Sequence, residues 1–454
     1  MHFRNSLDRQ APRQHTVTTG NIRLSATQNK RNPVLNGKTI GLLMRGRLPG
    51  QAVIQYTDRC NATCVQCSMQ AHNKTQRYTM NPDDVKRALD AMAQRGVQSI
   101  SFTGGEPLIY LKDIAGLMSY AGEAGIPFIR TGTNGFIFRN SESANFTDKI
   151  KRIADTLAET PVNTFWISLD SADSHIHEKN RGLSGIVKGI KKALPLFHER
   201  GLYPSANLGI NRYTGGNSTS TIFAGEGDKM DKERLYQLAK RAFSRFYSSA
   251  EHLGFTIVNA CYPMSLDSEN AGNRAIYGAT SEDFFIRFSW EEKVILFQAL
   301  FDTIPEYRSR LRIFTPRYAL HTLIKRYGGD MSVGYPCRGG IDFFFIDAKG
   351  MNTYPCGYRG QDNLGKFWDL DLKKLDTGQD CKLCDWECFR DPSDMAGPLL
   401  DLFSAPLTLP GKILKNRELA KIWLEDFRYY KACNFFNARS APDRERMSRF
   451  VATK

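Results

Sequence analysis

The sequence has no run of about 20 apolar residues, the length that a helix needs to cross a lipid bilayer. Its most lipid-like stretch, 399–414, is interrupted by Pro406 and Pro410, so we expect a helix packed on the protein, with a membrane surface as the alternative. No apolar segment follows the N-terminal methionine, which argues against a secretory signal. We therefore predict a protein without a transmembrane helix.

Acidic residues are scarce at the start of the sequence. Residues 1–50 contain nine Lys or Arg and one acid, Asp8, and so supply more than half of the net charge of +15. Such a basic segment suits anionic lipid, nucleic acid or an acidic peptide, but a solvated leader or a transit peptide has the same composition. We predict a basic, partly disordered arm over 1–50, with peripheral membrane contact as one of its uses.

Cysteine is too sparse for a disulfide scaffold, with ten residues in 454. The cysteines are clustered, three within 60–67 and five within 337–388. In a chain without an export signal, clustered cysteines indicate metal sites, and they favour the reducing cytoplasm.

From residue 51 onward, short β-rich runs alternate with helical patterns. This alternation predicts the α/β class, with a parallel sheet and right-handed crossovers. Six strand–helix units are too few for an eight-unit TIM barrel and fit a partial (β/α)6 barrel. The predicted strands are 52–56, 99–102, 127–130, 164–169, 205–210 and 255–259, and the predicted helices are 83–95, 111–124, 148–159, 186–200 and 232–252.

In such barrels the chemistry is placed at the carboxyl ends of the strands. Polar or sulfur-containing residues follow each predicted strand, so we expect them to gather at one end of the sheet. They are Cys60, the Gly104-Gly105-Glu106-Pro107 motif, Asn134, Ser168 with Asp170, Asn211 and Cys261.

The pattern changes after the predicted barrel. We expect a barrel over 51–280, a helical linker over 281–330, a cysteine-rich domain over 331–392 and a basic helical tail over 393–454. A β-hairpin is predicted over 341–354, turning at Lys349-Gly350.

Cys60, Cys64 and Cys67 have the spacing CxxxCxxC. Three thiolates on one short loop can hold three irons of a [4Fe–4S] cube and leave the fourth iron open to another ligand. The alternative is a structural zinc site completed by His72.

The CxxxCxxC spacing, followed about 40 residues later by GGEP, resembles the radical S-adenosylmethionine (SAM) superfamily over roughly residues 50–260. The resemblance implies that SAM binds the open iron and is split by electron transfer into a 5′-deoxyadenosyl radical. It places Gly104, Gly105 and Glu106 at the SAM amino group. It also places Ser168 and Asp170 at the ribose hydroxyls, with Asn134 and Asn211 as weaker candidates that equally suit turns.

The second cysteine group resembles the SPASM and Twitch auxiliary-cluster domains of that superfamily. Five residues separate Gly350 from Cys356, where the pattern has four, and there are too few cysteines for two complete clusters. The resemblance therefore implies one auxiliary [4Fe–4S] cluster, and an all-cysteine zinc site is the alternative. The implied ligands are Cys337, Cys356, Cys381 and Cys384, with Cys388 either replacing one of them or a buried thiol.

The predicted function is hydrogen abstraction from a substrate that is oxidised, crosslinked or rearranged. Peptides or proteins lead as substrates, and a lipid or small metabolite is the alternative; a non-enzymatic iron–sulfur or zinc protein is a third reading. A flavodoxin or ferredoxin is the expected electron donor. His175, His177 and Cys261 are weak catalytic candidates, each equally explained as a solvated or buried side chain. We expect the protein in the cytoplasm, with the membrane surface as an alternative.

Overall fold

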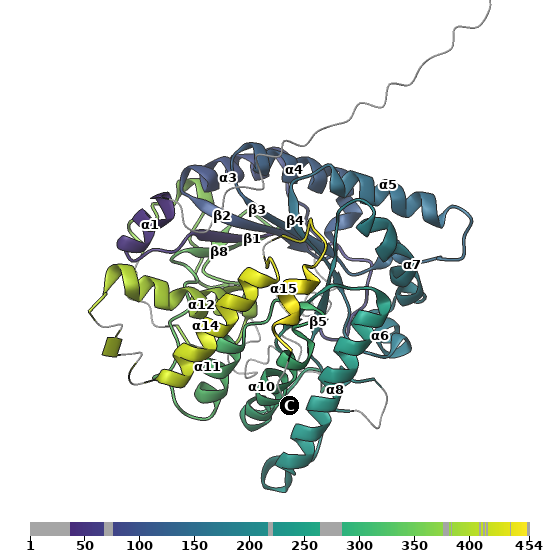
Figure 1. Cartoon of the computed structure of the whole chain (residues 1–454). Coiled ribbons are helices and arrows are strands. Elements are labelled where there is room, and N and C mark those ends of the chain that lie inside the picture. Colours follow the sequence, from purple (N-terminus) through teal and green to yellow (C-terminus); the bar gives the residue numbers. More distant parts are fainter. Residues whose placement is uncertain are drawn as a thin grey trace, which may run out of the picture.

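The computed structural model describes residues 37–67, 76–216, 221–263, 284–375 and 381–451, the last without 383, 408–409, 412–413, 415 and 436. Strands and helices alternate through its first part, as the sequence predicts (Figure 1). The strands are β1 (Gly50–Thr57), β2 (Val97–Gly104), β3 (Phe128–Thr133), β4 (Val162–Ser168), β5 (Ser205–Gly209) and β6 (Ile257–Cys261). The helices are α3 (Pro82–Gln94), α4 (Leu111–Glu123), α5 (Phe146–Ala158), α6 (Ser174–Arg181), α7 (Ile186–His198) and α8 (Lys232–Leu253).

All six predicted strands pair in sequence order, and every pair from β1 to β6 is parallel. This confirms the α/β class, and the unbroken strand order fits the partial barrel. A short seventh strand, β7 (Arg312–Ile313), continues the sheet beyond β6. No sequence pattern predicts β7, because two residues are too few for a recognisable pattern.

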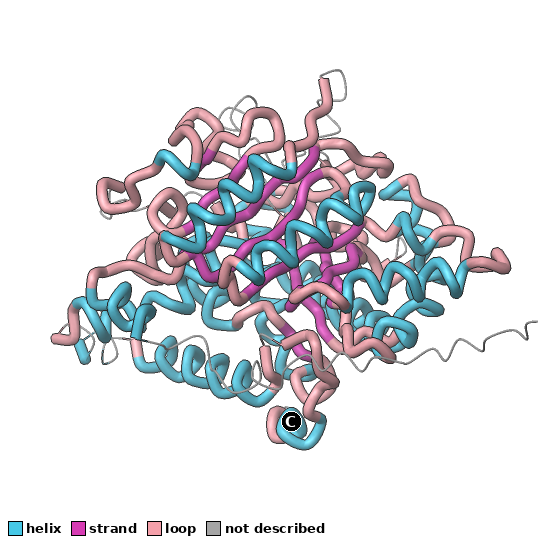
Figure 2. The backbone as a smooth tube through the Cα atoms, turned by 90° about the horizontal axis from the view of Figure 1, so that it is seen from above, coloured by secondary structure: helices cyan, strands magenta, loops and turns pink. Residues whose placement is uncertain are grey.

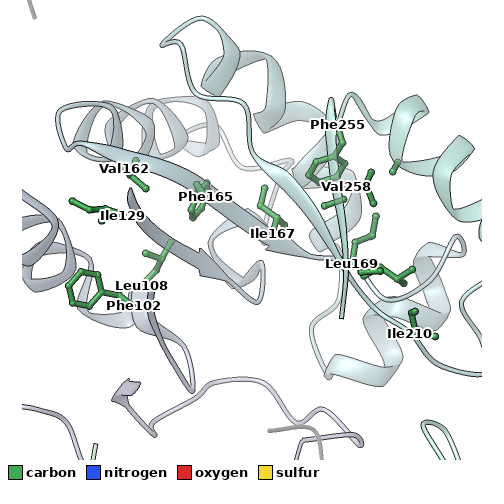
Figure 3. Packing of buried hydrophobic residues seen from close by; sticks show 14 of the residues in the cluster. Phe102, Leu108, Ile129, Val162, Phe165, Ile167, Leu169, Ile210, Phe255 and Val258 are labelled. Carbon is green, nitrogen blue, oxygen red and sulfur yellow. The ribbon is translucent and has the colours of Figure 1, made fainter. Parts of the chain in front are cut away.

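One face of the sheet is apolar and carries the helices, which cross the strands in Figure 2. Phe102, Ile129, Phe165 and Val258 belong to this core, and Figure 3 shows them spread along the successive strands. Because side chains alternate along a strand, the neighbouring residues point to the opposite face, called here the inner face. The inner face is polar over β2 to β6, with Ser101, Arg130, Thr164, Asn207 and Asn259.

The cysteine-rich segment is joined to this sheet. Its strand β8 (Phe343–Ile346) pairs parallel with β1, and β9 (Thr353–Tyr354) pairs antiparallel with β8. The predicted hairpin is therefore present, and it extends the main sheet at the β1 edge. Phe343 and Phe345 pack with Val53, Trp386 and Phe389 in a second apolar cluster.

The remaining helices lie on the side of the sheet away from α3, α4 and α5 (Figure 1). α10 packs against both α8 and α11, and α12 packs against α1 and α11. Their bounds are α1 (Gly37–Met44), α10 (Trp290–Tyr307), α11 (Arg317–Tyr327), α12 (Glu387–Ser404), α14 (Arg417–Ala432) and α15 (Arg444–Ser448). The predicted domain boundaries at 280, 330 and 392 stay predictions.

The end of the predicted N-terminal arm is structured. Leu43 and Leu48 are buried in the second apolar cluster, and Arg47 Nε donates to Asp342 Oδ1 at 2.7 Å. Residues 1–36, which hold most of the predicted arm, lie outside the described residues. No helix in the described part of the chain is long and apolar enough to span a bilayer.

Candidate active site

The loop with the first three cysteines leaves β1 and docks on the end of α6. Thr63 N donates to the carbonyl of Arg181 at 2.9 Å, and Val65 N donates to that of Asn180 at 3.3 Å. Gly182 follows α6 with φ of 65°, and a Cβ there would lie 2.1 Å from Thr63 Oγ1. A glycine at this position therefore permits both the left-handed turn and the close approach of the loop.

The two glycines of the GGEP motif lie against the chain that leads into the same loop. Gly105 N donates to Thr57 O at 2.7 Å, and Glu106 N donates to Arg59 O at 2.8 Å. A Cβ on Gly104 would approach Thr57 O to 2.0 Å, and one on Gly105 would approach Arg59 O to 2.1 Å. Glycine is required here by contact with the protein's own backbone, in addition to any contact with SAM.

Glu106 is fully buried and connects the ends of β2 and β3. Its carboxylate accepts from Leu108 N at 3.0 Å and from Asn134 N at 2.5 Å. Burial raises the pKa of Glu106 to about 7, against the opposite effect of these hydrogen bonds. The carboxylate predicted to meet the SAM amino group is thus also a structural acceptor for two backbone N–H groups.

Asn134 reaches the first cysteine directly. Its Nδ2 donates to Asn61 Oδ1 at 2.9 Å and lies 3.6 Å from Cys60 Sγ, while its Oδ1 accepts from Phe136 N at 2.9 Å. The predicted turn role and a contact with the cysteine loop are both present.

Asp170 is buried in an ion pair with Arg181. Arg181 Nε and Nη2 donate to the two carboxylate oxygens at 2.7 and 2.9 Å, and Gln66 Nε2 donates at 3.2 Å. Burial alone would raise the pKa of Asp170, but Arg181 holds it below its ordinary value. Both carboxylate oxygens therefore already accept hydrogen bonds from Arg181. The predicted contact of Asp170 with ribose stays a prediction, and a ribose hydroxyl would have to share these oxygens with Arg181.

The other predicted residues differ in burial and in the contacts that they make. Asn211 is fully buried, and its amide bonds to the backbone of Asp170, Gly209 and Tyr213, so it holds a turn. Ser168 is half-buried at the end of β4, in register with Asn207. His175 is exposed on α6, whereas His177 is buried and its Nδ1 accepts from Asp170 N at 3.1 Å.

The first cysteine group is partly buried and close to a cation. Burial raises the pKa of Cys64 to about 12, and Arg181 opposes this rise. Burial also raises the pKa of Cys60, while the hydrogen bonds from Ala62 N and Asn134 lower it. Such thiols ionise readily only when a metal centre supplies positive charge, which fits a cluster held at this loop. The sequence did not indicate that Arg181 lies beside the cysteine loop, because Arg181 is more than 100 residues from Cys64.

Four cysteines of the second group line one small cavity. Its walls also include Arg359, Trp386 and Phe389, and Cys337 N donates to Cys381 O at 3.0 Å. Burial raises the pKa of Cys356 to about 12 and that of Cys384 well above its ordinary value. Four thiols that repel one another when ionised fit a metal centre in this cavity. The four are Cys337, Cys356, Cys381 and Cys384.

Cys388 is not among the residues that line this cavity. It lies in the first turn of α12, where its Sγ is 3.5 Å from Glu387 Oε1. Glu387 also raises the pKa of Cys261, after the larger effect of burial, and Cys261 Sγ accepts from Asn207 Nδ2 at 3.2 Å. The structure therefore brings Cys261 and Cys388 together around one carboxylate. Within the described ranges, no three His, Cys, Asp or Glu side chains are drawn together as a ligand set, so the assignment of a metal centre to each cysteine group rests on residue type and enclosure.

The sequence is similar to parts of several known proteins. A probable GTP 3′,8-cyclase of Methanocaldococcus jannaschii is 26% identical over 144 residues, which are 31% of this chain and 44% of that protein. An AdoMet-dependent heme synthase of Methanosarcina barkeri is 22% identical over 305 residues, 67% of this chain and 75% of that protein. The chain thus spans about half of the length of the first of these relatives and three quarters of the second.

Among solved structures, Streptococcus suis SuiB bound to precursor peptide SuiA aligns with 73% of this chain and 65% of its own, with a TM-score of 0.47 and 18% identity. The sequence profile of the Radical SAM superfamily matches residues 54–239, the region that runs from the second half of β1 into α8 and includes the first three cysteines. Proteins of this superfamily use a [4Fe–4S] cluster and SAM. Residues 54–239 of this chain therefore match a radical SAM domain.

Proposed function

We propose that this protein cleaves SAM reductively and abstracts a hydrogen atom from its substrate. The observation that carries the proposal is the placement of Cys60, Cys64 and Cys67 on one loop at the carboxyl end of β1, inside the matched domain. A [4Fe–4S] cluster bound there supplies the electron that splits SAM. Asn134 and Arg181 hold the loop through contacts with Cys60 and Thr63.

We further propose that the second cysteine cavity holds an auxiliary [4Fe–4S] cluster. Its four thiols lie beside β8, which pairs with β1, so the cavity adjoins the sheet that carries the first site. Cys337, Cys356, Cys381 and Cys384 would hold this cluster, which would supply a site able to accept or relay an electron. This supports a reaction in which the substrate is oxidised, crosslinked or rearranged.

We propose a peptide or protein as substrate, in line with the resemblance of the second cysteine group to auxiliary-cluster domains that commonly serve peptide-modifying enzymes. A small metabolite is the second candidate. It is favoured by the similarity to the heme synthase, because that match covers 305 residues and so extends beyond the radical SAM domain. The cytoplasm is the proposed location.

The proposed activity is tested by anaerobic purification, reconstitution with iron and sulfide, reduction, and addition of SAM. We expect 5′-deoxyadenosine from the wild-type chain and none from Cys64→Ala. Cys433→Ala is the matched control, because Cys433 is buried in a separate apolar cluster with Tyr429 and Met447 and should not affect turnover. Zinc in place of iron, or full activity of Cys64→Ala, would overturn the proposal and favour a non-enzymatic metal-binding protein.

The substrate class is tested by two binding measurements. Pull-down of a short peptide encoded beside this protein's gene would support the peptide substrate. In turnover, that peptide, labelled at the hydrogen that is abstracted, should then transfer the label to 5′-deoxyadenosine. Co-sedimentation with anionic liposomes, without peptide capture, would support a lipid substrate instead.

A further inference from the structure

Arg130 lies in the middle of β3 on the polar inner face of the sheet. It pairs in register with Ser101 of β2 and Thr164 of β4. Its Nε and Nη2 atoms are buried, and neither has a hydrogen-bond partner among the described residues. A buried donor without a partner costs roughly 1–3 kcal/mol, and more when it is charged. An arginine that binds nothing would therefore be a costly residue at this position.

The ionisable groups that act on Arg130 come from the first turn of α12. Burial lowers the pKa of Arg130, and Cys388 and Glu387 oppose that change. Within the described residues, no ion pair joins Arg130 to Glu387, and Glu387 Oε2 is also buried without a partner. The inner face thus carries a guanidinium with unused donors and, near it, a carboxyl oxygen with unused acceptor capacity.

An aromatic side chain lies between Arg130 and the cysteine loop. A Cβ on Gly132 would lie 2.1 Å from Nε1 of Trp166, so the indole lies directly across β3 at this glycine. Asn134, which contacts Cys60, directly follows the end of β3 at Thr133, two residues beyond Gly132. Arg130, Trp166 and Asn134 are therefore arranged in that order along the inner face, toward the first site.

We infer that Arg130 binds an oxyanion of the substrate, a carboxylate or a phosphate, while Trp166 contacts the part of the substrate nearer to Cys60. This inference rests on the proposed function and names the substrate's chemical class. A guanidinium fork matches the two oxygens of either anion. Asn134 is four residue steps beyond Arg130, about 13 Å at the rise of an extended chain. The anionic group of the substrate therefore lies several bonds away from the carbon that loses hydrogen.

The inference is tested by isothermal titration calorimetry of the anaerobic, reconstituted full chain. The probes are 3-phenylpropionate, phenyl phosphate and the neutral 3-phenylpropionamide. We expect at least one anion to bind about tenfold or more tightly than the amide, and Arg130→Gln to remove this preference. The anion that binds more tightly identifies carboxylate or phosphate. Arg130→Lys should restore part of the preference, because it keeps the charge and loses the fork.

Arg152→Gln is the matched control, since Arg152 is exposed on α5 and should leave both affinities unchanged. Iron content and thermal unfolding midpoint show whether Arg130→Gln folds. Equal binding of amide and anions by the wild-type chain, or unchanged anion binding by folded Arg130→Gln, would overturn the inference. Formation of 5′-deoxyadenosine by the wild-type chain tests the proposed function separately, so the two can fail independently.

Discussion

Asn134 connects the GGEP motif to the first cysteine: its backbone N–H donates to Glu106 at 2.5 Å, and its side-chain Nδ2 lies 3.6 Å from Cys60 Sγ. The two motifs are about 40 residues apart in the sequence and belong to different strands. An N–H group beside a sulfur ligand stabilises the thiolate and fixes its direction. Asn134 is therefore a positioning residue for the proposed cluster.

Replacing Asn134 with alanine should weaken retention of the first cluster. The variant removes the N–H group beside Cys60 and the hydrogen bond to Asn61, and outer-shell changes of this kind cost about 10–100-fold in metal affinity. Iron loss to a chelator, followed over time under anaerobic conditions, measures the effect. Asn145→Ala, an exposed position before α5, is the control, and equal rates of iron loss in the two variants would contradict the prediction.

Glu106→Gln should destabilise the protein even without SAM. The carboxylate accepts two backbone N–H groups, and a glutamine amide can offer only one acceptor oxygen to them. One buried N–H group then lacks a partner, so we expect the free energy of unfolding to fall by about 1–3 kcal/mol. Urea unfolding of the apo chain measures the change. If the Glu106→Gln variant were as stable as the wild type but bound SAM less tightly, Glu106 would serve the ligand alone.

The sequence was sufficient to predict most of the fold because the barrel strands and helices have strong local patterns. Every predicted strand and helix of the first part is present, and so is the hairpin at 341–354. β7 and α1 were not predicted, since two residues and one short apolar segment carry little periodic signal. The pairing of β8 with β1 was not predicted either, because it joins residues almost 300 positions apart.

The sequence predicts the types of residue at the two sites, but not the contacts that these residues make. The sequence indicated the four cysteines that line the second cavity, but it could not decide the place of Cys388. Arg181 and Arg130 carry no motif, and their importance depends on partners, or missing partners, from distant elements. Asp170 was expected to be available to ribose, and only the fold shows that Arg181 occupies both of its oxygens.

Removing Arg181 should be costlier than removing the whole Asp170–Arg181 pair. Arg181→Gln leaves a buried, ionised Asp170 without its partner, which costs about 3–5 kcal/mol. The double variant Asp170→Asn, Arg181→Gln buries no charge and should recover much of that loss. A double-mutant cycle of urea unfolding measures the coupling. Additive single effects would mean that the pair does not stabilise the fold.

Cys384 and Cys388 should differ in their effect on iron content. Cys384 lines the cavity proposed for the auxiliary cluster, whereas Cys388 lies beside Glu387 and Arg130. We expect Cys384→Ala to lose about four irons per chain, the content of one cluster, and Cys388→Ala to lose none. Iron and sulfide analysis with Mössbauer spectroscopy measures this. If Cys388→Ala lost the auxiliary cluster, Cys388 would be a ligand and the assignment of the four cavity cysteines would be wrong.

His177 should make the protein less stable at acidic pH. Burial lowers the pKa of His177 to about 4, below the value of about 6.5 expected in the unfolded chain, and its Nδ1 accepts from Asp170 N. The unfolded state therefore binds more protons between these two values. The stabilising contribution of neutral His177 is complete above pH 6.5 and is lost as the pH falls toward 4, by up to about 3 kcal/mol.

His177→Asn keeps an acceptor near the position of Nδ1 and removes the titration. The difference in free energy of unfolding between this variant and the wild type should therefore change over that pH range. Exposed His175→Asn should leave the pH dependence of the wild type unchanged, and a parallel profile for His177→Asn would show that His177 does not carry the acid sensitivity.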